Sequence, residues 1–378
     1  MKYLIADLNI TLNGHKFGFV NNLLHYAGKN RPNDEFVFLV NRSADFQLES
    51  AYPHIQVIQP AAEEQKQLQS QPGLLQKSAA EWTLIDREAR RYGCQRVILM
   101  ELDLYQVAIG RNTAPYKISG IWFRPYARME PEGRGILQKM RFLKSKLQKQ
   151  MVMKLALRNP SLDKIFILND EQMPAWLDAR RFFTLPDPWF DYPMAEGSDL
   201  RKQYGIPDDH MVLLQFGYAD ERKNNENILA ALNELPYTDI TLLIIGKFKP
   251  GYEDELKRLK TGPFTMITRD EFISDEEMES TFHQSDVILR MNVNFFGSSG
   301  VVGIAARHDK PVIVSDSGVM AELVKKYKLG DVVNPHDPQA IRSAILRYRQ
   351  SPPVIDGAAY RDTHDIRAFA EVLLEGGL

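Results

Sequence analysis

The sequence lacks several features that define common protein classes. Cys94 is the single cysteine among 378 residues, which excludes an intramolecular disulfide and a cysteine-rich metal site and is typical of a reducing compartment. No apolar stretch approaches the length that spans a bilayer. The N-terminal run MKYLIADLNITLNGHK has no small-residue cleavage site and is typical of a first β-strand rather than a signal peptide. These absences predict a cytoplasmic protein.

Charge and histidine spacing exclude further classes. The formal net charge is -2, which gives no argument for nucleic acid as a partner. The eight histidines are scattered, and none stands at metal-ligand spacing from a carboxylate or a second histidine, so we expect no metal site. The motifs GxSxG, GxGxxG and the Walker loop are also missing. Any functional site must therefore be sought in other residues.

What the sequence does contain is an alternation of apolar, β-branched runs with longer amphipathic segments. The runs in the first half are KYLIADLNI, EFVFLV, IQVI, RVILM and KIFIL, and those in the second are MVLLQFG, ITLLIIG, FTMIT, DVILRM and KPVIVS. Helical spacing fills the intervals, as in residues 17–26, 224–235 and 275–283. Buried strands separated by helices predict parallel sheets. Two such series, in a chain too long for one core, predict two doubly wound α/β domains.

The break between the two series falls in a stretch rich in proline and acidic residues. Residues 186–198 contain three prolines, and Ser198 is suited to cap the helix that follows. We therefore place a first domain at residues 1–188 and a second at 189–361.

One segment, residues 134–158, differs in composition from the rest of the chain. It contains no acid, and its cations are Arg134, Lys139, Arg141, Lys144, Lys146, Lys149, Lys154 and Arg158. Apolar residues recur at helical spacing between Ile136 and Leu157. The pattern is typical of a basic amphipathic helix on anionic lipid headgroups, and equally of a domain helix with a solvated basic face. Periodicity alone does not decide between these two interpretations.

Two loops follow expected strands, at the sheet edge where α/β proteins bind ligands. Gly14 precedes His15 and permits a tight turn, but short turns of this kind commonly use glycine for shape alone. Arg222 and Lys223 stand at an expected helix start, where a cation opposes the helix dipole unless an anion compensates. The second loop therefore favours phosphate binding, with two solvent-facing cations as the alternative.

A third loop, in NFFGSSGVVGIAARHDKPVIVSDSG, joins small residues to an apolar helix. Ser298, Ser299 and Gly300 precede Val301, and small residues at a buried helix start let a ligand approach the backbone amides. Serine at this position more commonly caps the helix. Taken alone, the loop suits a phosphate or ordinary packing.

Six stretches of the second half, taken in order, resemble the C-terminal domain of retaining, nucleotide-sugar-dependent glycosyltransferases of the group 1 (family 4) type. They are FFTLPDPWFDYP, LLQFGYADERKNNENILAALNEL, ITLLIIGKFKPGYEDELKRLK, FISDEEMESTFHQSDVIL, SSGVVGIAARHDKPVIVSDSGVMAELV and LGDVVNPHDPQAIRSAI. In the first half the resemblance is thinner and rests on NGHKFGFVNNLLHYAGK and DKIFILND. In the family, that half binds the acceptor and varies more.

The resemblance implies the GT-B fold, with two facing Rossmann-like domains and a cleft between them. A C-terminal helix usually crosses back to the first domain, and residues 362–378 are expected to supply it. The family holds the donor diphosphate with cations and backbone amides, so neither a metal nor another cofactor is expected.

Site residues can be carried over by position. Lys223 matches the family's diphosphate-binding lysine, and Gly217 matches the glycine that ends the preceding strand. Gly14 and His15 match the loop that faces the donor, with the acceptor entering near His15. The remaining donor-binding residues implied by the resemblance are Ser298, Ser299, Gly300, Val301 and Glu322.

The sequence departs from the family pattern at two places. Tyr218 stands where the family has an arginine directly after the strand-end glycine, and Arg222 is the candidate to replace it as a catalytic cation. The second of the family's paired glutamates falls on Ile304, and the first, expected within residues 294–296, is also missing. Those glutamates contact the donor ribose and lie near the sugar, so these contacts are expected to differ here.

The resemblance implies a hexosyltransferase that moves a sugar, with retention, from a nucleotide diphosphate sugar to a glycan or lipid-linked acceptor. Such an enzyme would serve cell-surface polysaccharide or glycoconjugate biosynthesis, in the cytoplasm or peripherally at the inner face of the membrane. The missing glutamates favour an alternative, a catalytically silent homologue that binds a nucleotide sugar or a protein partner. A nucleotide-sugar epimerase ranks third, because its acid and base groups cannot be placed in the sequence.

Overall fold

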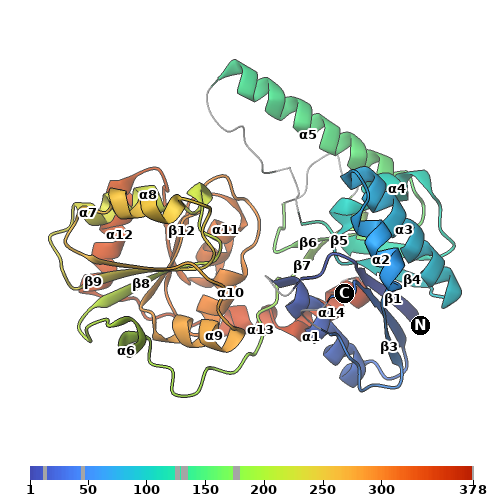
Figure 1. Cartoon of the computed structure of the whole chain (residues 1–378), viewed down its shortest axis with the longest axis horizontal. Helices are drawn as coiled ribbons and strands as arrows, with labels where there is room; N and C mark the ends of the chain where they lie inside the picture. Colours follow the sequence, from blue (N-terminus) through green and yellow to red (C-terminus); the bar gives the residue numbers. More distant parts are fainter. Residues whose placement is uncertain (12–14, 44–46, 124–127, 129–134, 173–178, 377–378) are drawn as a thin grey trace. The chain divides into compact units, whose positions relative to one another are not determined.

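The computed structural model describes residues 1–11, 15–43, 47–123, 128, 135–172 and 179–376. The chain forms two compact units (Figure 1). Unit 1 comprises Met1–Pro186 together with Ile366–Leu378, and unit 2 comprises Asp187–Asp365. The boundaries expected from the sequence, after residues 188 and 361, lie two and four residues from these positions.

Unit 1 contains a seven-stranded sheet in which every pairing is parallel. Its order is β3-β2-β1-β4-β5-β6-β7. The strands are β1 (Lys2–Asp7), β2 (Glu35–Val40), β3 (Ile55–Ile58), β4 (Arg96–Leu99), β5 (Lys117–Ile121), β6 (Leu162–Leu168) and β7 (Phe182–Leu185). The order reverses direction between β1 and β4, which is the switch point of a doubly wound sheet.

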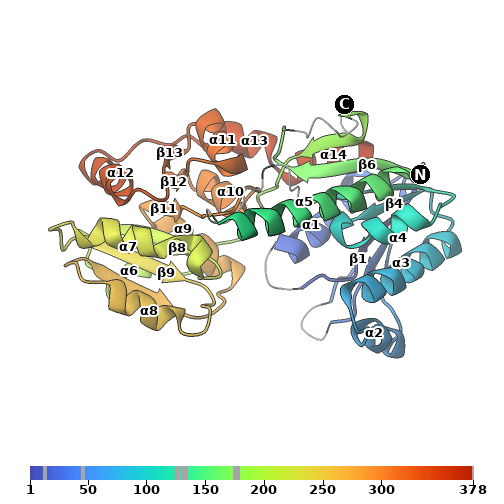
Figure 2. The same ribbon diagram turned by 90° about the horizontal axis from the view of Figure 1, so that it is seen from above.

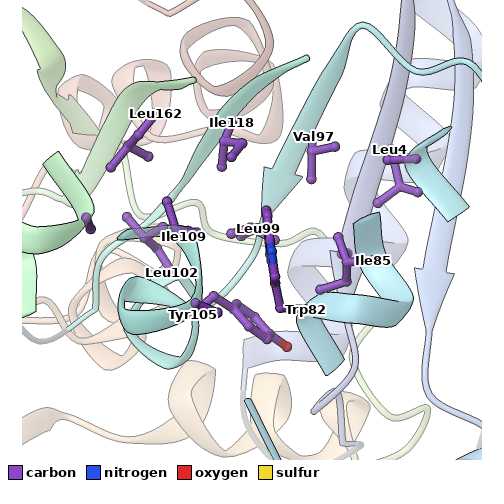
Figure 3. Close-up of a cluster of buried hydrophobic side chains, with 14 of the residues drawn as sticks. Leu4, Trp82, Ile85, Val97, Leu99, Leu102, Tyr105, Ile109, Ile118 and Leu162 are labelled. Carbon is purple, nitrogen blue, oxygen red and sulfur yellow. The ribbon is translucent and has the colours of Figure 1, made fainter. Parts of the chain in front are cut away.

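Helices cover both faces of this sheet. They are α1 (His15–Asn30), α2 (Ala62–Gln69), α3 (Leu74–Arg91), α4 (Gln106–Arg111), α5 (Ile136–Leu157) and α14 (Ile366–Glu375), with short 3-10 turns η1 (Leu102–Leu104) and η2 (Ala179–Arg181). Figure 2 shows α3, α4 and α5 side by side. Figure 3 shows the core beneath α3 and α4, where Trp82 and Ile85 meet Val97 and Leu99 of β4. Burial of this apolar surface holds the layers together.

The C-terminal segment completes unit 1. Residues of α14 contact α1, and the Phe369 ring stacks on the Phe19 ring with centroids 5.4 Å apart. The sequence predicted a helix over 362–378 that returns to the first domain, and the structure has two helices in and just before this segment. One is α13 (Ala358–Thr363), within unit 2, and the other is α14, which begins at Ile366. His364 and Asp365 separate them.

Unit 2 contains a six-stranded sheet, also parallel throughout. Its order is β10-β9-β8-β11-β12-β13. The strands are β8 (Met211–Phe216), β9 (Ile240–Ile245), β10 (Thr265–Arg269), β11 (Val287–Arg290), β12 (Val312–Ser315) and β13 (Gly330–Val333). All six residues of β9 are buried, as expected for a strand covered on both faces.

Two helical layers enclose the second sheet (Figure 1). Side chains of α7 (Asn225–Asn233), α8 (Tyr252–Leu259) and α12 (Pro338–Gln350) fill one core. The opposite core contains side chains of α6 (Leu200–Tyr204), α9 (Asp275–Gln284), α10 (Gly300–Arg307), α11 (Gly318–Tyr327) and α13. The two doubly wound sheets expected from the alternating runs are confirmed.

Candidate functional site

The carboxyl ends of β8 and β11 meet where the strand order of unit 2 reverses. β8 pairs with β9 on one side and with β11 on the other, although two strands separate β8 and β11 in the sequence. Ligands of open α/β sheets bind outside the carboxyl ends of strands at such a point. The loops after β8 and β11 are therefore the first candidates for a site.

The loop after β8 is fixed by buried polar contacts. Asp220 accepts hydrogen bonds from the backbone and side chain of Arg222 and begins a short 3-10 turn, η3 (Glu221–Lys223). The Gln215 side chain donates to the Lys223 carbonyl at 3.0 Å. Asn224 adopts the left-handed conformation, with φ 62°, and its amide donates to the Pro335 carbonyl at 2.6 Å. Asparagine tolerates this conformation, so the chain can turn into α7 immediately after Lys223.

Lys223 is a buried cation that forms an ion pair with none of the carboxylates in the described residues. Its side chain is only 7% exposed, and its Nζ donates to the Phe216 carbonyl at 3.3 Å. Burial lowers the pKa of Lys223 well below its ordinary value, and the positive charge of Arg290 lowers the pKa further. Within the part of the chain that the structure describes, no carboxylate lies within 4 Å of Nζ. A charged amine in this position favours a bound anion.

Arg290 ends β11 and reaches the same carbonyl. Its Nη1 donates to the Phe216 carbonyl at 3.2 Å, while its buried Nε has no hydrogen-bond partner among the described residues. Burial lowers the pKa of Arg290 to about 10, with a further contribution from Arg222. Arg290 was not among the site residues predicted from the sequence. Its only local signal is a cation at the end of an otherwise apolar run.

Arg222, in contrast, is occupied by a carboxylate. Its side chain is 66% exposed, and its Nη2 lies 2.7 Å from an oxygen of Asp220, which also accepts from Nε. The hydrogen bond to Asp220 raises the pKa of Arg222. The structure thus brings Lys223 and Arg290 together and pairs Arg222 with Asp220.

The loop after β11 leads to the N-terminus of α10. Ser299 is the N-cap by position, but its side chain makes no capping hydrogen bond. Ser298 donates to Asp187 at 2.6 Å, so this hydroxyl is engaged with a buried carboxylate. The first amides of α10, at Gly300 and Val301, have no intrahelical acceptor by helix geometry. They can therefore donate to an anion.

The comparisons with known proteins decide what kind of domain this is. Residues 197–356 match the family model "Glycosyl transferases group 1". The match covers all six strands of the second sheet. Unit 2 is a group 1 glycosyltransferase domain.

A curated relative and two solved structures extend the comparison beyond the group 1 domain. The chain is 23% identical over 194 residues to alpha-galactosylglucosyldiacylglycerol synthase of Streptococcus pneumoniae, a match that covers 50% of each protein. The chain thus spans about half the length of this curated relative. Sucrose-phosphate synthase of Thermosynechococcus elongatus is similar in structure, with a TM-score of 0.70 and 19% identity. The match covers 99% of this chain and 97% of the synthase chain. HepE of Anabaena, solved in complex with UDP, is similar in structure, with a TM-score of 0.67 and 16% identity. The match covers 100% of this chain and 99% of the HepE chain. The fold is GT-B.

The structure locates the remaining predicted residues of the group 1 domain. Gly217 has φ 103°, and a Cβ added there would lie 3.3 Å from Lys223 Nζ. Glu322 is exposed on α11. Ile304, which stands in place of the family's second glutamate, is buried in the core beneath α10. An isoleucine facing the core cannot provide the ribose contact of that glutamate.

The predicted residues of unit 1 lie around the β1–α1 connection. Gly14 lies outside the described residues, and His15 is the first residue of α1. A polar network anchors the segment just after β1. Lys77 of α3 donates to Asn9 Oδ1 at 2.8 Å, Asn9 donates to Glu81 at 3.2 Å, and Tyr105 donates to Glu81 at 2.9 Å. Sequence reasoning missed this network, because its members come from distant parts of the chain.

Outside the group 1 domain, α5 presents an unusual surface. Ile136, Met140, Leu143, Leu147 and Met151 are between 56% and 78% exposed, whereas Met153 and Ala156 are buried. At 3.6 residues per turn the five exposed residues fall within an arc of roughly 80°, on the side away from Met153 and Ala156. We call these five residues the α5 stripe. The exposed surface of α5 therefore includes an apolar stripe as well as basic side chains.

Across the described ranges, no group of three or more His, Cys, Asp or Glu side chains is arranged to hold a metal ion. No helix in those ranges is long and apolar enough to cross a membrane.

Proposed function

We propose that this protein transfers a hexose, with retention, from a nucleotide diphosphate sugar to a glycan or lipid-linked acceptor. The supporting observation is the buried Lys223 ammonium at the carboxyl end of β8 in a group 1 domain. We further propose that the product belongs to cell-surface polysaccharide or glycoconjugate biosynthesis. The Streptococcus pneumoniae relative is named as a glycolipid synthase, which supports an acceptor of this kind.

The chemistry of the reaction explains why a buried cation suits it. When the bond between sugar and diphosphate breaks, negative charge grows on the departing nucleoside diphosphate. A preorganised cation and helix N-terminal amides stabilise this charge most effectively where water is excluded. Lys223 and the amides at Gly300 and Val301 would serve in this way, so we propose that no metal ion is required.

The residues at the start of α10, Glu322 and the residues of the β1–α1 connection keep the roles implied by the resemblance. We propose that Gly14, Ser298, Ser299 and Glu322 contact the donor and that the acceptor enters near His15. Ser298 donates to Asp187, and this hydrogen bond holds the loop before α10 in place. Ser298 would therefore contribute to donor binding by positioning that loop.

We also propose that a lipid-linked acceptor is met at an anionic membrane surface through α5. Flanking the α5 stripe are Lys139 and Lys146 on one side and Lys144 and Arg141 on the other, placed by helical geometry. Helices of this kind lie in the headgroup region with their apolar face inserted. The protein would then be peripheral to the membrane.

The main test is transfer of an isotopically labelled sugar by the Lys223→Met variant. A panel of UDP-, GDP- and ADP-sugars, screened by thermal shift, first identifies the donor. Because Lys223 would act on charge that develops in the transition state, we expect kcat/KM to fall by about 100- to 1000-fold. Lys325→Met, on the exposed side of α11, is the matched control and should retain its activity. Unchanged turnover in Lys223→Met would exclude this assignment.

The buried Ile304 favours the alternative of a catalytically silent homologue, because the ribose-binding carboxylate is missing. Donor hydrolysis in the absence of acceptor separates the two functions. An active transferase is expected to hydrolyse the donor slowly, whereas a silent homologue that only binds the nucleotide sugar should show no turnover.

A further inference from the structure

We infer that Arg290, rather than Arg222, supplies the second cation that binds the donor diphosphate beside Lys223. The inference rests on the proposed function, since it names a residue of the same site. It concerns the position where Tyr218 stands in place of the family's arginine. Arg290, at the end of the neighbouring strand β11, would replace the arginine that is missing after β8.

The register between β8 and β11 places Arg290 beside the end of β8. Leu289 of β11 pairs with Gln215 of β8, so Arg290 lies opposite Phe216, the last residue of β8. At this level the Phe216 carbonyl accepts from both Lys223 Nζ, at 3.3 Å, and Arg290 Nη1, at 3.2 Å. Two cations thus share one neutral acceptor.

Charge counting shows what is missing from this arrangement. The local groups are Lys223, Arg290, Arg222 and the carboxylate of Asp220, which is bound by Arg222 at 2.7 Å. Three cations and one anion leave a net charge of +2. Two like charges in a desolvated place repel one another, and each lowers the other's tendency to remain charged. A diphosphate provides the compensating negative charge.

Hydrogen-bonding capacity points to the same ligand. Arg290 Nε is buried and has no acceptor within the described part of the chain, although its N–H is a strong donor. A guanidinium presents its donors in a planar fork that fits two phosphate oxygens. A phosphate at this place would satisfy Nε and neutralise the charge together.

Gly217 keeps a side chain out of the place that both cations face. A Cβ at this residue would lie 3.3 Å from Lys223 Nζ and 3.9 Å from Arg290 Nη1, so any side chain would enter the space that both cations face. Its φ of 103° also suits glycine. Lys223 Nζ and Arg290 Nη1 therefore approach the same side of Gly217.

Isothermal titration with UDP, GDP and ADP tests the inference. The variants are Arg290→Gln, which removes the charge but keeps a donor for the Phe216 carbonyl, and Arg222→Gln, which is the matched control. Loss of a charge-assisted hydrogen bond predicts that Arg290→Gln weakens binding of the preferred diphosphate by about 10- to 100-fold. Arg222→Gln should change it by less than about threefold, as expected for an exposed, already paired cation.

The corresponding nucleoside, which carries no phosphate, separates phosphate contact from a merely structural role. Arg290→Gln should leave nucleoside affinity unchanged while diphosphate affinity falls. Equal losses for both ligands would show that Arg290 only supports the fold, and a larger loss in Arg222→Gln than in Arg290→Gln would also overturn the inference. If Arg290→Gln does not fold, Arg290→Lys, which retains charge without the planar fork, should weaken diphosphate binding alone. Failure of the wild-type protein to bind any of the three diphosphates would instead refute the proposed function.

Discussion

At the scale of single residues, the position of Lys223 is set by neutral polar groups rather than by an ion pair. Gln215, Asn224 and Asn225 are buried around its backbone, and Gln215 also donates to Asn225 Oδ1 at 3.2 Å. These contacts hold the main chain, so the ammonium keeps its position without an ion pair to a described carboxylate. A site held in this way is organised before binding.

His364 provides a residue-scale prediction of pH dependence. It is buried in unit 2, stacks on Tyr360 with centroids 4.0 Å apart, and has its pKa lowered to about 4 by burial. Thr363 Oγ1 and the Tyr360 carbonyl lie within 3.1 Å of its Nδ1, and Lys326 lowers its pKa slightly further. Because the folded-state pKa lies below the unfolded value, folding favours the neutral ring. This stabilisation is present above the unfolded pKa of about 6.5 and is lost as the pH falls toward 4.

Denaturant unfolding at several pH values measures this contribution. Between pH 7.5 and 5 we expect His364 to reduce the free energy of unfolding by about 2 kcal/mol. In His364→Gln that part of the pH dependence should disappear, while other titrating groups, such as His283, contribute equally to both proteins. An identical pH dependence in the two proteins would contradict the assignment.

The residue scale is also where sequence reasoning succeeds and fails for a clear reason. Lys223 could be selected because its mismatch with a helix start is local. Arg290 lies far along the chain from Lys223, and only the order of strands in the sheet brings the two together. The local pattern of DVILRM predicts a buried strand but does not indicate which residues Arg290 contacts.

At the scale of elements, α5 illustrates a helix that is anchored at one end and exposed along the rest. Gly110 of α4 allows α4 to pack closely against the C-terminal part of α5. A Cβ at Gly110 would lie 2.4 Å from Leu155 Cγ and 2.8 Å from the Leu155 carbonyl carbon. Toward its N-terminus the α5 stripe remains uncovered. Figure 1 shows this end of α5 extending beyond the sheet of unit 1. The sequence predicted the helix, but exposure of its apolar side required the structure.

Vesicle sedimentation tests the surface of α5. We expect the protein to bind vesicles that contain phosphatidylglycerol more tightly than pure phosphatidylcholine vesicles, and added salt should weaken the binding. Replacing both Leu143 and Leu147 by glutamine should reduce binding, because less apolar area would be inserted.

Leu75→Gln, which alters an exposed leucine on α3 rather than on α5, is the control and should bind like the wild type. The membrane contact would be refuted by equal binding to both vesicle types, or by no effect of the double substitution. Catalysis in solution, with a short soluble acceptor, should not change in either variant.

At the scale of the whole molecule, unit 1 is assembled from two parts of the chain that unit 2 separates. Phe369, Leu373 and Leu374 of α14 are buried, and Lys164 of β6 donates to the Glu375 carbonyl at 2.6 Å. The fold classes of both units could be predicted from alternating apolar runs. The break between α13 and α14 could not, because both segments have a helical pattern and only tertiary contacts assign them to different units.

Ending the chain after Asp365 tests the dependence of unit 1 on α14. Loss of the Phe19–Phe369 contact and of the buried leucines should expose the adjacent face of α1. Hydrogen exchange is expected to accelerate in the strands of unit 1 while residues 187–365 keep their protection. A chain that ends after Gly376 is the control. Unaltered protection in both units would show that α14 contributes little to stability.

The divided make-up of unit 1 has a consequence for synthesis on the ribosome. All residues of unit 2 emerge before α14 does, since α14 follows unit 2 in the chain. Unit 2 therefore begins after unit 1 but can be completed before it. Unit 1 lacks α14 until the end of synthesis, and one face of α1 stays uncovered until then. Domains generally fold as units during translation, and uncovered apolar surface invites association with other chains. Nascent chains arrested between residues 186 and 365 should accordingly be the forms that most need a chaperone.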